Sequence, residues 1–249
     1  MICFASDIHL GAGDAAERER VERCFAAWLD EVAARAEVLY LLGDLFDFWF
    51  EYPGVEPRGH EAVLEKLKAL VRRGIRVVLL TGNHDMWVGD YLSARCGIEL
   101  HTRPLDGVEH YGKRLFLAHG DDMNIGFNPP LWCINRLFRS RWLRRLACRI
   151  VPYDTMQRFG RWWSGRSRKS HAGTPLEPAL TDRLRDWARH HAERCPGIDA
   201  YIFGHMHVAC DRTDEIPRVL HLGDWSRRPS YARLDETGRL TLNFFDLPS

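Results

Sequence analysis

The sequence predicts an α/β sandwich with a mixed sheet. Apolar runs of strand length alternate with amphipathic helical runs as far as residue 203, and several short strands follow them. Five short polar blocks directly follow strand-like runs, an arrangement typical of a site at the carboxyl ends of strands. Because 249 residues with 45% hydrophobic content suffice for one substantial core, we expect a single domain over residues 1–249.

The N-terminal part of the chain predicts alternating strands and helices. Asp14, with Glu17 three residues later, resembles a capping box, and Val21, Phe25 and Val32 follow it at helical spacing. The expected elements are a strand at 2–6, a helix that begins near Asp14, a strand at 37–42, a helix at 59–73 that ends at Gly74, and a strand at 75–80.

The other expected core elements lie on both sides of a long basic segment. A hairpin is predicted to turn at Tyr111-Gly112. The further elements are a strand at 114–118, a helix at 176–194, a strand at 199–203, and three strands within 218–246 with turns near Gly223 and Gly238.

Residues 123–175 predict a helical insertion that caps the site. Residues 131–170 carry ten arginines, one lysine and a single acid, a local charge of +10 in a chain of net charge +1. Apolar residues recur there at the spacing of an amphipathic helix, at Leu131, Ile134, Phe138, Trp142, Leu146 and Ile150. An apolar stripe on a helix is usually part of a buried core, and arginines such as these are usually solvated. A purely structural role and a role in ligand binding therefore both remain open for this segment.

Seven side chains of metal-binding type stand in the five polar blocks. The blocks are Asp7-Ile8-His9, Gly43-Asp44, Gly82-Asn83-His84-Asp85, His119-Gly120 and Gly204-His205-Met206-His207. Each block alone occurs often by chance, but all five after strand-like runs indicate one metal site. The other histidines are expected to be solvated or locally satisfied; they are His60, His101, His110, His171, His190, His191 and His221. We expect Gly223-Asp224 to form a turn near the site.

The spacing within the blocks suggests how the ligands are shared. Residues two apart in a strand point to the same face, so Asp7 and His9 are expected to bind one ion, and His205 and His207 either one ion or one each. A carboxylate at Asp44 would bridge two cations. Two ions about 3.5–4 Å apart share a hydroxide and stabilise an in-line displacement at phosphorus.

The remaining block residues suggest the metal and the acid–base group. Asn83 supplies a neutral oxygen and His119 an imidazole, and a nitrogen and oxygen ligand set without thiolate suits Mn²⁺, Fe²⁺, Zn²⁺ or Co²⁺ without selecting among them. His84 is expected to protonate the leaving oxygen or stabilise transition-state charge. Asp85 is expected to hydrogen-bond His84 and orient it.

In this order the blocks resemble the calcineurin-like metallophosphoesterase superfamily, whose pattern is DxH, GD, GNH[DE], H and GHxH. The resemblance implies a four-layer α/β/β/α sandwich and a phosphoesterase with two divalent ions, for which we expect Mn²⁺. It assigns the first ion to Asp7, His9, Asp44 and His207. It assigns the second ion to Asp44, Asn83, His119 and His205. It leaves His84, a residue that is not a ligand, as a catalytic group beside the bridging Asp44.

Within that superfamily the chain is most similar to the UDP-2,3-diacylglucosamine diphosphatase family of lipid A biosynthesis. The similarity lies in the GDLFDFW run at 43–49, the insertion after His119-Gly120-Asp121, the overall length and the stretch Ser167-Arg168-Lys169-Ser170. It implies hydrolysis of the pyrophosphate bond of UDP-2,3-diacylglucosamine to UMP and 2,3-diacylglucosamine 1-phosphate. The implied substrate contacts are Asn83, His84, Asp121, Ser167, Arg168, Lys169 and His205. The well-known branch of that family has arginine where this chain has His84.

The composition of the cap fits a diacyl sugar nucleotide as substrate. An apolar groove would be lined by Trp132, Phe138, Trp142 and Trp162. The pyrophosphate would be bound by Arg166, Arg168 and Lys169. The positive charge would also attract an anionic membrane surface, so we expect a cytoplasmic protein peripheral to the inner membrane, of unknown oligomeric state.

Two other functions remain open. A phosphodiesterase or nuclease would use the same metals, although the apolar share of the cap and the near-neutral net charge argue against a nucleic-acid partner. A catalytically inactive scaffold would have lost ligands, and none is missing. Seven cysteines without a CxxC pair indicate reduced thiols, and no apolar run approaches the length of a bilayer span.

Overall fold

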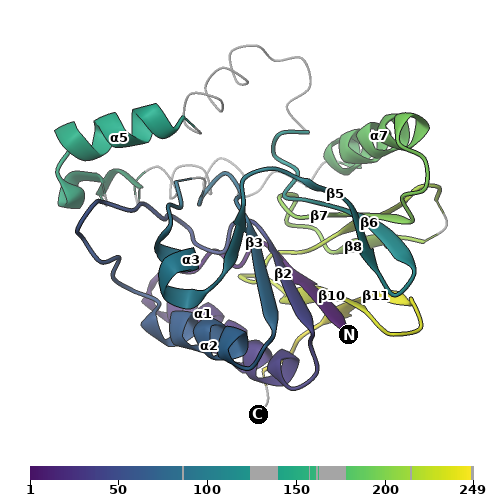
Figure 1. Ribbon diagram of the computed structural model, residues 1–249, viewed down its shortest axis with the longest axis horizontal. Coiled ribbons are helices and arrows are strands. Elements are labelled where there is room, and N and C mark those ends of the chain that lie inside the picture. The colour runs from purple at the N-terminus through teal and green to yellow at the C-terminus, as the bar shows by residue number, and fades with distance from the viewer. Residues whose placement is uncertain are drawn as a thin grey trace.

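Two β-sheets that face each other form the centre of the protein (Figure 1). The computed structural model describes residues 1–85, 87–123, 140–156, 158–160, 162, 178–213 and 215–247. Several features expected in the cap therefore lie outside the described residues. They are the apolar positions Leu131, Trp132, Ile134 and Phe138 and the basic stretch from Arg166 to Lys169.

The first sheet has six strands and supplies three of the polar blocks. In spatial order they are β11 (Leu240–Phe244), β10 (Ser230–Leu234), β1 (Ile2–Ala5), β2 (Val38–Leu42), β3 (Arg76–Leu80) and β4 (Glu99–His101). β1 to β4 are parallel, and β10 is antiparallel to both of its neighbours. Because parallel strands end at one edge, the blocks after β1, β2 and β3 lie side by side.

The second sheet has five strands and supplies the other two blocks. In spatial order they are β5 (Leu105–His110), β6 (Lys113–Ala118), β7 (Ala200–Phe203), β9 (Arg218–His221) and β8 (Cys210–Arg212). β6, β7 and β9 are parallel, whereas β5 and β8 pair antiparallel with their neighbours. The residues after β6, β7 and β9 therefore also lie at one edge.

Helices cover the outer face of each sheet. The helices of the first sheet are α1 (Ala15–Ala33), α2 (Glu61–Arg72) and α3 (Tyr91–Cys96), and α7 (Pro178–Arg194) covers the second. Phe25 of α1 and Leu67 of α2 are buried with the first sheet, and Leu184 of α7 is buried with the second. A third core lies between the sheets, where Phe4 and Ile202 are fully buried. The α/β/β/α order implied by the resemblance is confirmed.

Most element predictions agree with the structure. The carboxylate of Asp14 accepts a hydrogen bond from the Glu17 backbone N–H at 2.9 Å, which is the expected cap of α1. The hairpin turns at Tyr111-Gly112 between β5 and β6 as predicted. Three elements, α3, β4 and β8, were not predicted from the sequence. They contain six, three and three residues, too few to show a hydrophobic period.

The described part of the cap contains α5 (Arg141–Ile150), whose N-cap residue is Ser140. Its Ala147 and Cys148 pack against a cluster that includes the buried ring of Phe50. Trp142 and Ile150, by contrast, are 69% and 68% exposed. The predicted apolar stripe is therefore not a buried core stripe at these two positions. No helix among the described residues is both long and apolar enough to span a membrane.

Candidate metal centre

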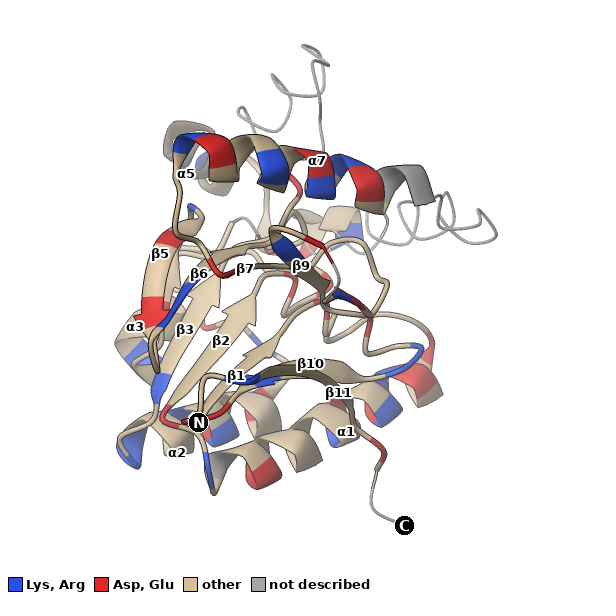
Figure 2. Cartoon of the chain, turned by 90° about the vertical axis from the view of Figure 1, so that its right-hand side faces the viewer, with Lys and Arg blue, Asp and Glu red and all other residues tan. Residues whose placement is uncertain are grey.

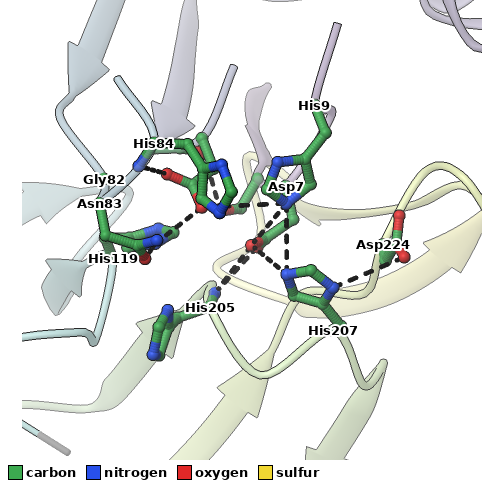
Figure 3. A network of polar contacts seen from close by, with 12 residues as sticks. Asp7, His9, Gly82, Asn83, His84, His119, His205, His207 and Asp224 are labelled. Carbon is green, nitrogen blue, oxygen red and sulfur yellow. Dashed lines mark hydrogen bonds and ion pairs between the residues drawn. The ribbon is translucent and has the colours of Figure 1, made fainter. Parts of the chain in front are cut away.

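The predicted ligands converge at the edge where the strands of both sheets end (Figure 3). The first sheet contributes Asp7 and His9 after β1, Asp44 after β2 and Asn83 after β3. The second contributes His119 after β6 and His205 and His207 after β7. Asp7 and Asp44 have exposed fractions of 0% and 1%, so both carboxyls are removed from bulk solvent.

Left-handed backbone conformations, not strand alternation, turn these side chains toward one another. Five of the predicted ligands have positive φ angles: Asp7 (56°), His9 (49°), Asp44 (51°), His205 (68°) and His207 (55°). Non-glycine residues rarely adopt this region, and clusters of such residues are typical of functional sites. The expectation that Asp7 and His9 share a strand face is therefore wrong, since β1 ends at Ala5.

The glycines of the blocks allow the turns to approach closely. A Cβ atom at Gly82 would collide with the Asp44 carboxylate, and one at Gly204 would collide with the Ser6 hydroxyl. A Cβ atom at Gly43 would lie 2.6 Å from Nδ1 of His119. Glycine therefore precedes the ligands in these blocks because any side chain would push the neighbouring ligands apart.

One group of predicted ligands joins the end of β1 in the first sheet to the end of β7 in the second. Nε2 of His207 lies 3.2 Å from Nε2 of His9 and 3.4 Å from Oδ1 of Asp7. Oδ1 of Asp7 lies 3.8 Å from Nε2 of His9. The three side chains thus offer three donor atoms to one point.

A second group is built around Asp44 and His119. Oδ2 of Asp44 lies 3.4 Å from Nε2 of His119 and 3.8 Å from Nε2 of His9, so this carboxylate stands between the two groups. Oδ1 of Asn83 lies 3.2 Å from Nε2 of His119. Nδ1 of His119 donates to the carbonyl oxygen of Leu42 at 2.9 Å, which leaves Nε2 as the ring nitrogen that faces Asp44 and that could bind an ion after losing its proton.

His205 and His207, the two histidines of the last block, contact different groups of predicted ligands. His207 joins Asp7 and His9, whereas the ring of His205 packs against the ring of His119 with 5.1 Å between centroids. The backbone N–H of His205 donates to both carboxylate oxygens of Asp7, at 3.1 and 2.9 Å. The sequence had left open whether these histidines serve one ion or two, and their separation favours two.

The buried carboxylates of the candidate metal centre are stabilised by positive charge on neighbouring groups. Burial disfavours the charged form of Asp44, yet His119 and His84 hold the pKa of Asp44 well below its usual range. Burial also opposes the charge of His207, but Asp224 and Asp7 raise the pKa of His207 to about 10. Protons on these histidines balance the charge of the buried carboxylates. A divalent cation that displaces these protons would balance the same charge.

The donor set fits a pair of divalent ions. Bonds of about 2.0–2.2 Å from one ion to nitrogen and oxygen place neighbouring donors about 3–3.6 Å apart. The pairs His9–His207, Asp7–His207 and Asp44–His119 lie at 3.2, 3.4 and 3.4 Å, within that range. Oxygen and imidazole donors without thiolate suit several first-row divalent metals.

Residues that contact the predicted ligands from outside the ligand set orient them. One of these, Asp224, was not recognised from the sequence as such a residue. Oδ2 of Asp224 lies 3.6 Å from Nδ1 of His207, and the charge of His207 offsets burial and lowers the pKa of Asp224 to about 2. Gly223-Asp224 was expected only as a turn near the site. The available signal was a Gly-Asp pair after an apolar run, the same pattern as Gly43-Asp44.

The expected pairing of Asp85 with His84 is wrong. The Asp85 carboxylate accepts the backbone N–H groups of Gly82 and Leu45, at 2.7 and 2.9 Å, and so holds the ligand turns together. His84 instead donates from Nδ1 to the carbonyl oxygen of Asp47 at 2.9 Å. Burial and the nearby charge of Asp44 raise the pKa of Asp85 to about 6.

Known proteins are similar to this chain over almost its whole length. The family profile described as Calcineurin-like phosphoesterase matches residues 1–209. The chain belongs to the calcineurin-like phosphoesterase family. A UDP-2,3-diacylglucosamine hydrolase of Porphyromonas gingivalis is 38% identical over 95% of this chain and 94% of that protein. The hydrolase of the same name from Pseudomonas paraeruginosa is 29% identical over 95% of this chain and 96% of that protein. An archaeal phosphodiesterase of known structure is 12% identical, with a TM-score of 0.49 over 98% of this chain and 99% of that one.

This calcineurin-like phosphoesterase is a metal-dependent hydrolase. Of the substrate contacts expected for it, Asp121 is buried two residues after His119. The expected contacts Ser167, Arg168 and Lys169 lie outside the described residues. Arg103, which was not singled out in the sequence, lines a cleft together with Thr81, His119 and Asp121.

Proposed function

We propose that the protein hydrolyses the pyrophosphate bond of UDP-2,3-diacylglucosamine and releases UMP and 2,3-diacylglucosamine 1-phosphate. The observation that carries the proposal is the convergence of Asp7, His9, Asp44, His119 and His207 at one edge of the sheets. We infer the substrate from the names of relatives that match almost the whole chain.

We propose two ion sites that share one carboxylate. The first would take Asp7, His9, Asp44 and His207, and the second Asp44, Asn83, His119 and His205. Mn²⁺ is the proposed metal. The position of Asp44 Oδ2 between His9 and His119 supports a bridging role. When bound, divalent ions would supply Lewis-acid activation of a water and neutralise phosphoryl charge.

The protein's own groups supply orientation and a proton. Asp224 holds the ring of His207, and the Leu42 carbonyl fixes the tautomer of His119. The backbone N–H of His84 donates to Oδ1 of Asp44 at 2.9 Å, and the ring of His84 lies edge-on to that of His9 with 4.8 Å between centroids. His84 thus lies beside two of the proposed ligands, Asp44 and His9, where its ring would donate a proton to the leaving phosphate oxygen.

The described part of the cap supports association with a membrane surface. Trp142 and Ile150 on α5 are exposed apolar side chains, and Arg145 and Arg149 are exposed cations on the same helix. Exposed apolar and cationic residues on one helix are suited to the surface of an anionic membrane. We propose that the protein associates peripherally with the cytoplasmic leaflet of the inner membrane through this helix.

A substrate comparison tests the proposal. The protein, supplied with Mn²⁺, is assayed on UDP-2,3-diacylglucosamine, on single-stranded RNA and DNA, and on a small chromogenic phosphodiester. Release of UMP from the lipid nucleotide, with little cleavage of nucleic acid, is the expected result. Rapid cleavage of nucleic acid without release of UMP would identify the chain as a nuclease instead.

A further inference from the structure

A second cluster of metal-binding side chains lies apart from this centre, where α7 ends above β5 (Figure 2). Asp106 stands on β5, His191 on α7, and Cys195 directly follows the last residue of α7. One ligand atom from each of these residues lies within 4.8 Å of the others. Oδ2 of Asp106 lies 3.6 Å from Nε2 of His191.

We propose that Asp106, His191 and Cys195 bind one thiophilic divalent metal ion, represented by Zn²⁺, which joins the C-terminal end of α7 to β5. Bonds of about 2.0–2.2 Å to nitrogen and oxygen and about 2.3 Å to sulfur give tetrahedral edges of about 3.3–3.6 Å. The Asp106–His191 pair already has this separation. The site is independent of the proposed function.

The imidazole of His191 is held in place for such a role. Nδ1 of His191 lies 3.0 Å from the hydroxyl of Tyr201, which leaves Nε2 facing Asp106. The ring stacks on Trp187 at 18° with 4.9 Å between centroids, and it contacts Phe116 at the same separation. A metal-binding histidine usually has such a partner on its other nitrogen, because that partner fixes the tautomer and the ring.

The sequence spacing and the exposure also fit a metal site. His191 and Cys195 are four residues apart, and the Cys195 N–H donates to the His191 carbonyl at 2.8 Å, so helical bonding continues to the cysteine. The side chain of Asp106 is 46% exposed and that of His191 is 12% exposed. An ion can therefore enter from the Asp106 side, where water would complete the coordination.

The donor types distinguish this site from the candidate metal centre. A thiolate and a carboxylate balance the two charges of the ion, and the sulfur favours Zn²⁺ or Co²⁺ over Mn²⁺. No cysteine belongs to the described ligand groups of the centre at the sheet edge. A spectroscopic signal from metal–sulfur bonding consequently reports only the new site.

Titration of the full-length, chelator-treated protein with Co²⁺ tests the inference. We expect a near-ultraviolet charge-transfer band from thiolate to cobalt whose final intensity corresponds to one thiolate-bound Co²⁺ per chain and which disappears on addition of Zn²⁺. Cys195→Ser should abolish the band. Cys210→Ser, which changes another partly buried free cysteine, should leave it unchanged.

Two further variants separate coordination from a disturbed fold. Asp106→Asn, at an exposed position, should weaken Co²⁺ binding by at least about 10-fold, with an unchanged far-ultraviolet circular dichroism spectrum. Tyr201→Phe should keep the band but weaken binding by about 10–100-fold, the usual effect of losing a group that orients a ligand. A wild-type protein without the band, a band that persists in Cys195→Ser, or a band lost in Cys210→Ser would overturn the inference.

Discussion

Nε2 of His9 and Nε2 of His207 lie 3.2 Å apart, although the two histidines are 198 residues apart in the chain. His9 follows β1 in one sheet, and His207 follows β7 in the other. Two imidazole nitrogens at this distance need a shared proton or a cation that both bind. The packing of one sheet on the other therefore determines whether the proposed metal centre exists.

Asp44→Ala is expected to abolish phosphoesterase activity, because Asp44 Oδ2 stands between His9 and His119 and both proposed ions would lose a ligand. Metal analysis after loading with Mn²⁺ should show less than one ion per chain. Asp30→Ala, which removes an exposed carboxylate paired with Lys66, should keep both metal and activity. Retention of two ions by Asp44→Ala would rule out the bridging role.

Asp224→Asn is expected to lower Mn²⁺ affinity or turnover by about 10–100-fold, because the charge that holds the ring of His207 is lost. Asparagine keeps the shape of the side chain, so the global fold should be unchanged. Affinity is measured by Mn²⁺ titration of the chelated protein. The matched variant is Asp235→Asn in an exposed turn, and an equal loss in both variants would contradict the proposed role of Asp224.

The residues that meet in the candidate metal centre were predictable from the sequence, but the geometry that brings them together was not. The blocks after β1, β2, β3, β6 and β7 are visible because each follows a short apolar run. The left-handed conformations at Asp7, His9 and Asp44 were not predictable, since they depend on close approach across Gly43, Gly82 and Gly204. Strand alternation predicted that Asp7 and His9 lie close together, and they do, but left-handed backbone conformations are the reason.

The residues that orient the predicted ligands were the hardest to predict, because adjacency in the sequence does not indicate which side chains pair in the fold. Asp85 is adjacent to His84 in the chain, yet its carboxylate binds the backbone of Gly82 and Leu45. The partner of His207 is Asp224, which belongs to a different strand end. Such contacts arise from how strand ends pack, which local patterns do not encode.

His84→Ala is expected to reduce turnover by about 10²- to 10⁴-fold, the usual contribution of a positioned proton donor. Metal content should be preserved, because His84 is proposed to act on the leaving oxygen and its Nδ1 is already bonded to the Asp47 carbonyl. Turnover and bound Mn²⁺ are measured on the same sample. Loss of the ions together with activity would instead make His84 a ligand.

The buried His221 is expected to make folding stability depend on pH. Burial, with a smaller effect of Arg212, lowers the pKa of His221 to about 4 in the folded protein, against 6.5 for an ordinary histidine. Stability is fully present above pH 6.5 and is lost as pH falls toward 4, because the unfolded chain binds the proton first. At pH 5 the loss should be about 2 kcal/mol.

Urea unfolding of the wild-type protein and of His221→Leu at pH 7 and pH 5 checks this expectation. The difference between the two pH values should be smaller in the variant by about 2 kcal/mol, since other titrating groups contribute equally to both proteins. An identical pH dependence in the two proteins would mean that His221 is accessible to protons when folded.

The basic stretch of the cap is expected to act on the lipid substrate rather than on the reaction itself. Replacement of Arg168 and Lys169 by alanine should weaken hydrolysis of UDP-2,3-diacylglucosamine more than hydrolysis of a small chromogenic phosphodiester. The ratio of the two values of kcat/KM is the measurement. An equal decrease for both substrates would indicate a folding defect.

The exposed face of α5 is expected to bind membrane. Trp142 and Ile150 are 69% and 68% exposed, and burying a large apolar side chain contributes about 1.5–3 kcal/mol. Trp142→Ser combined with Ile150→Ser should therefore weaken binding to anionic vesicles by at least about 100-fold in a sedimentation assay, with the small phosphodiester still hydrolysed normally. Ile216→Ser removes an apolar side chain that is 93% exposed outside the cap, and it should have no effect on binding. If Ile216→Ser weakened binding as much as the double variant, binding would reflect general surface hydrophobicity, and α5 would not be the membrane-binding element.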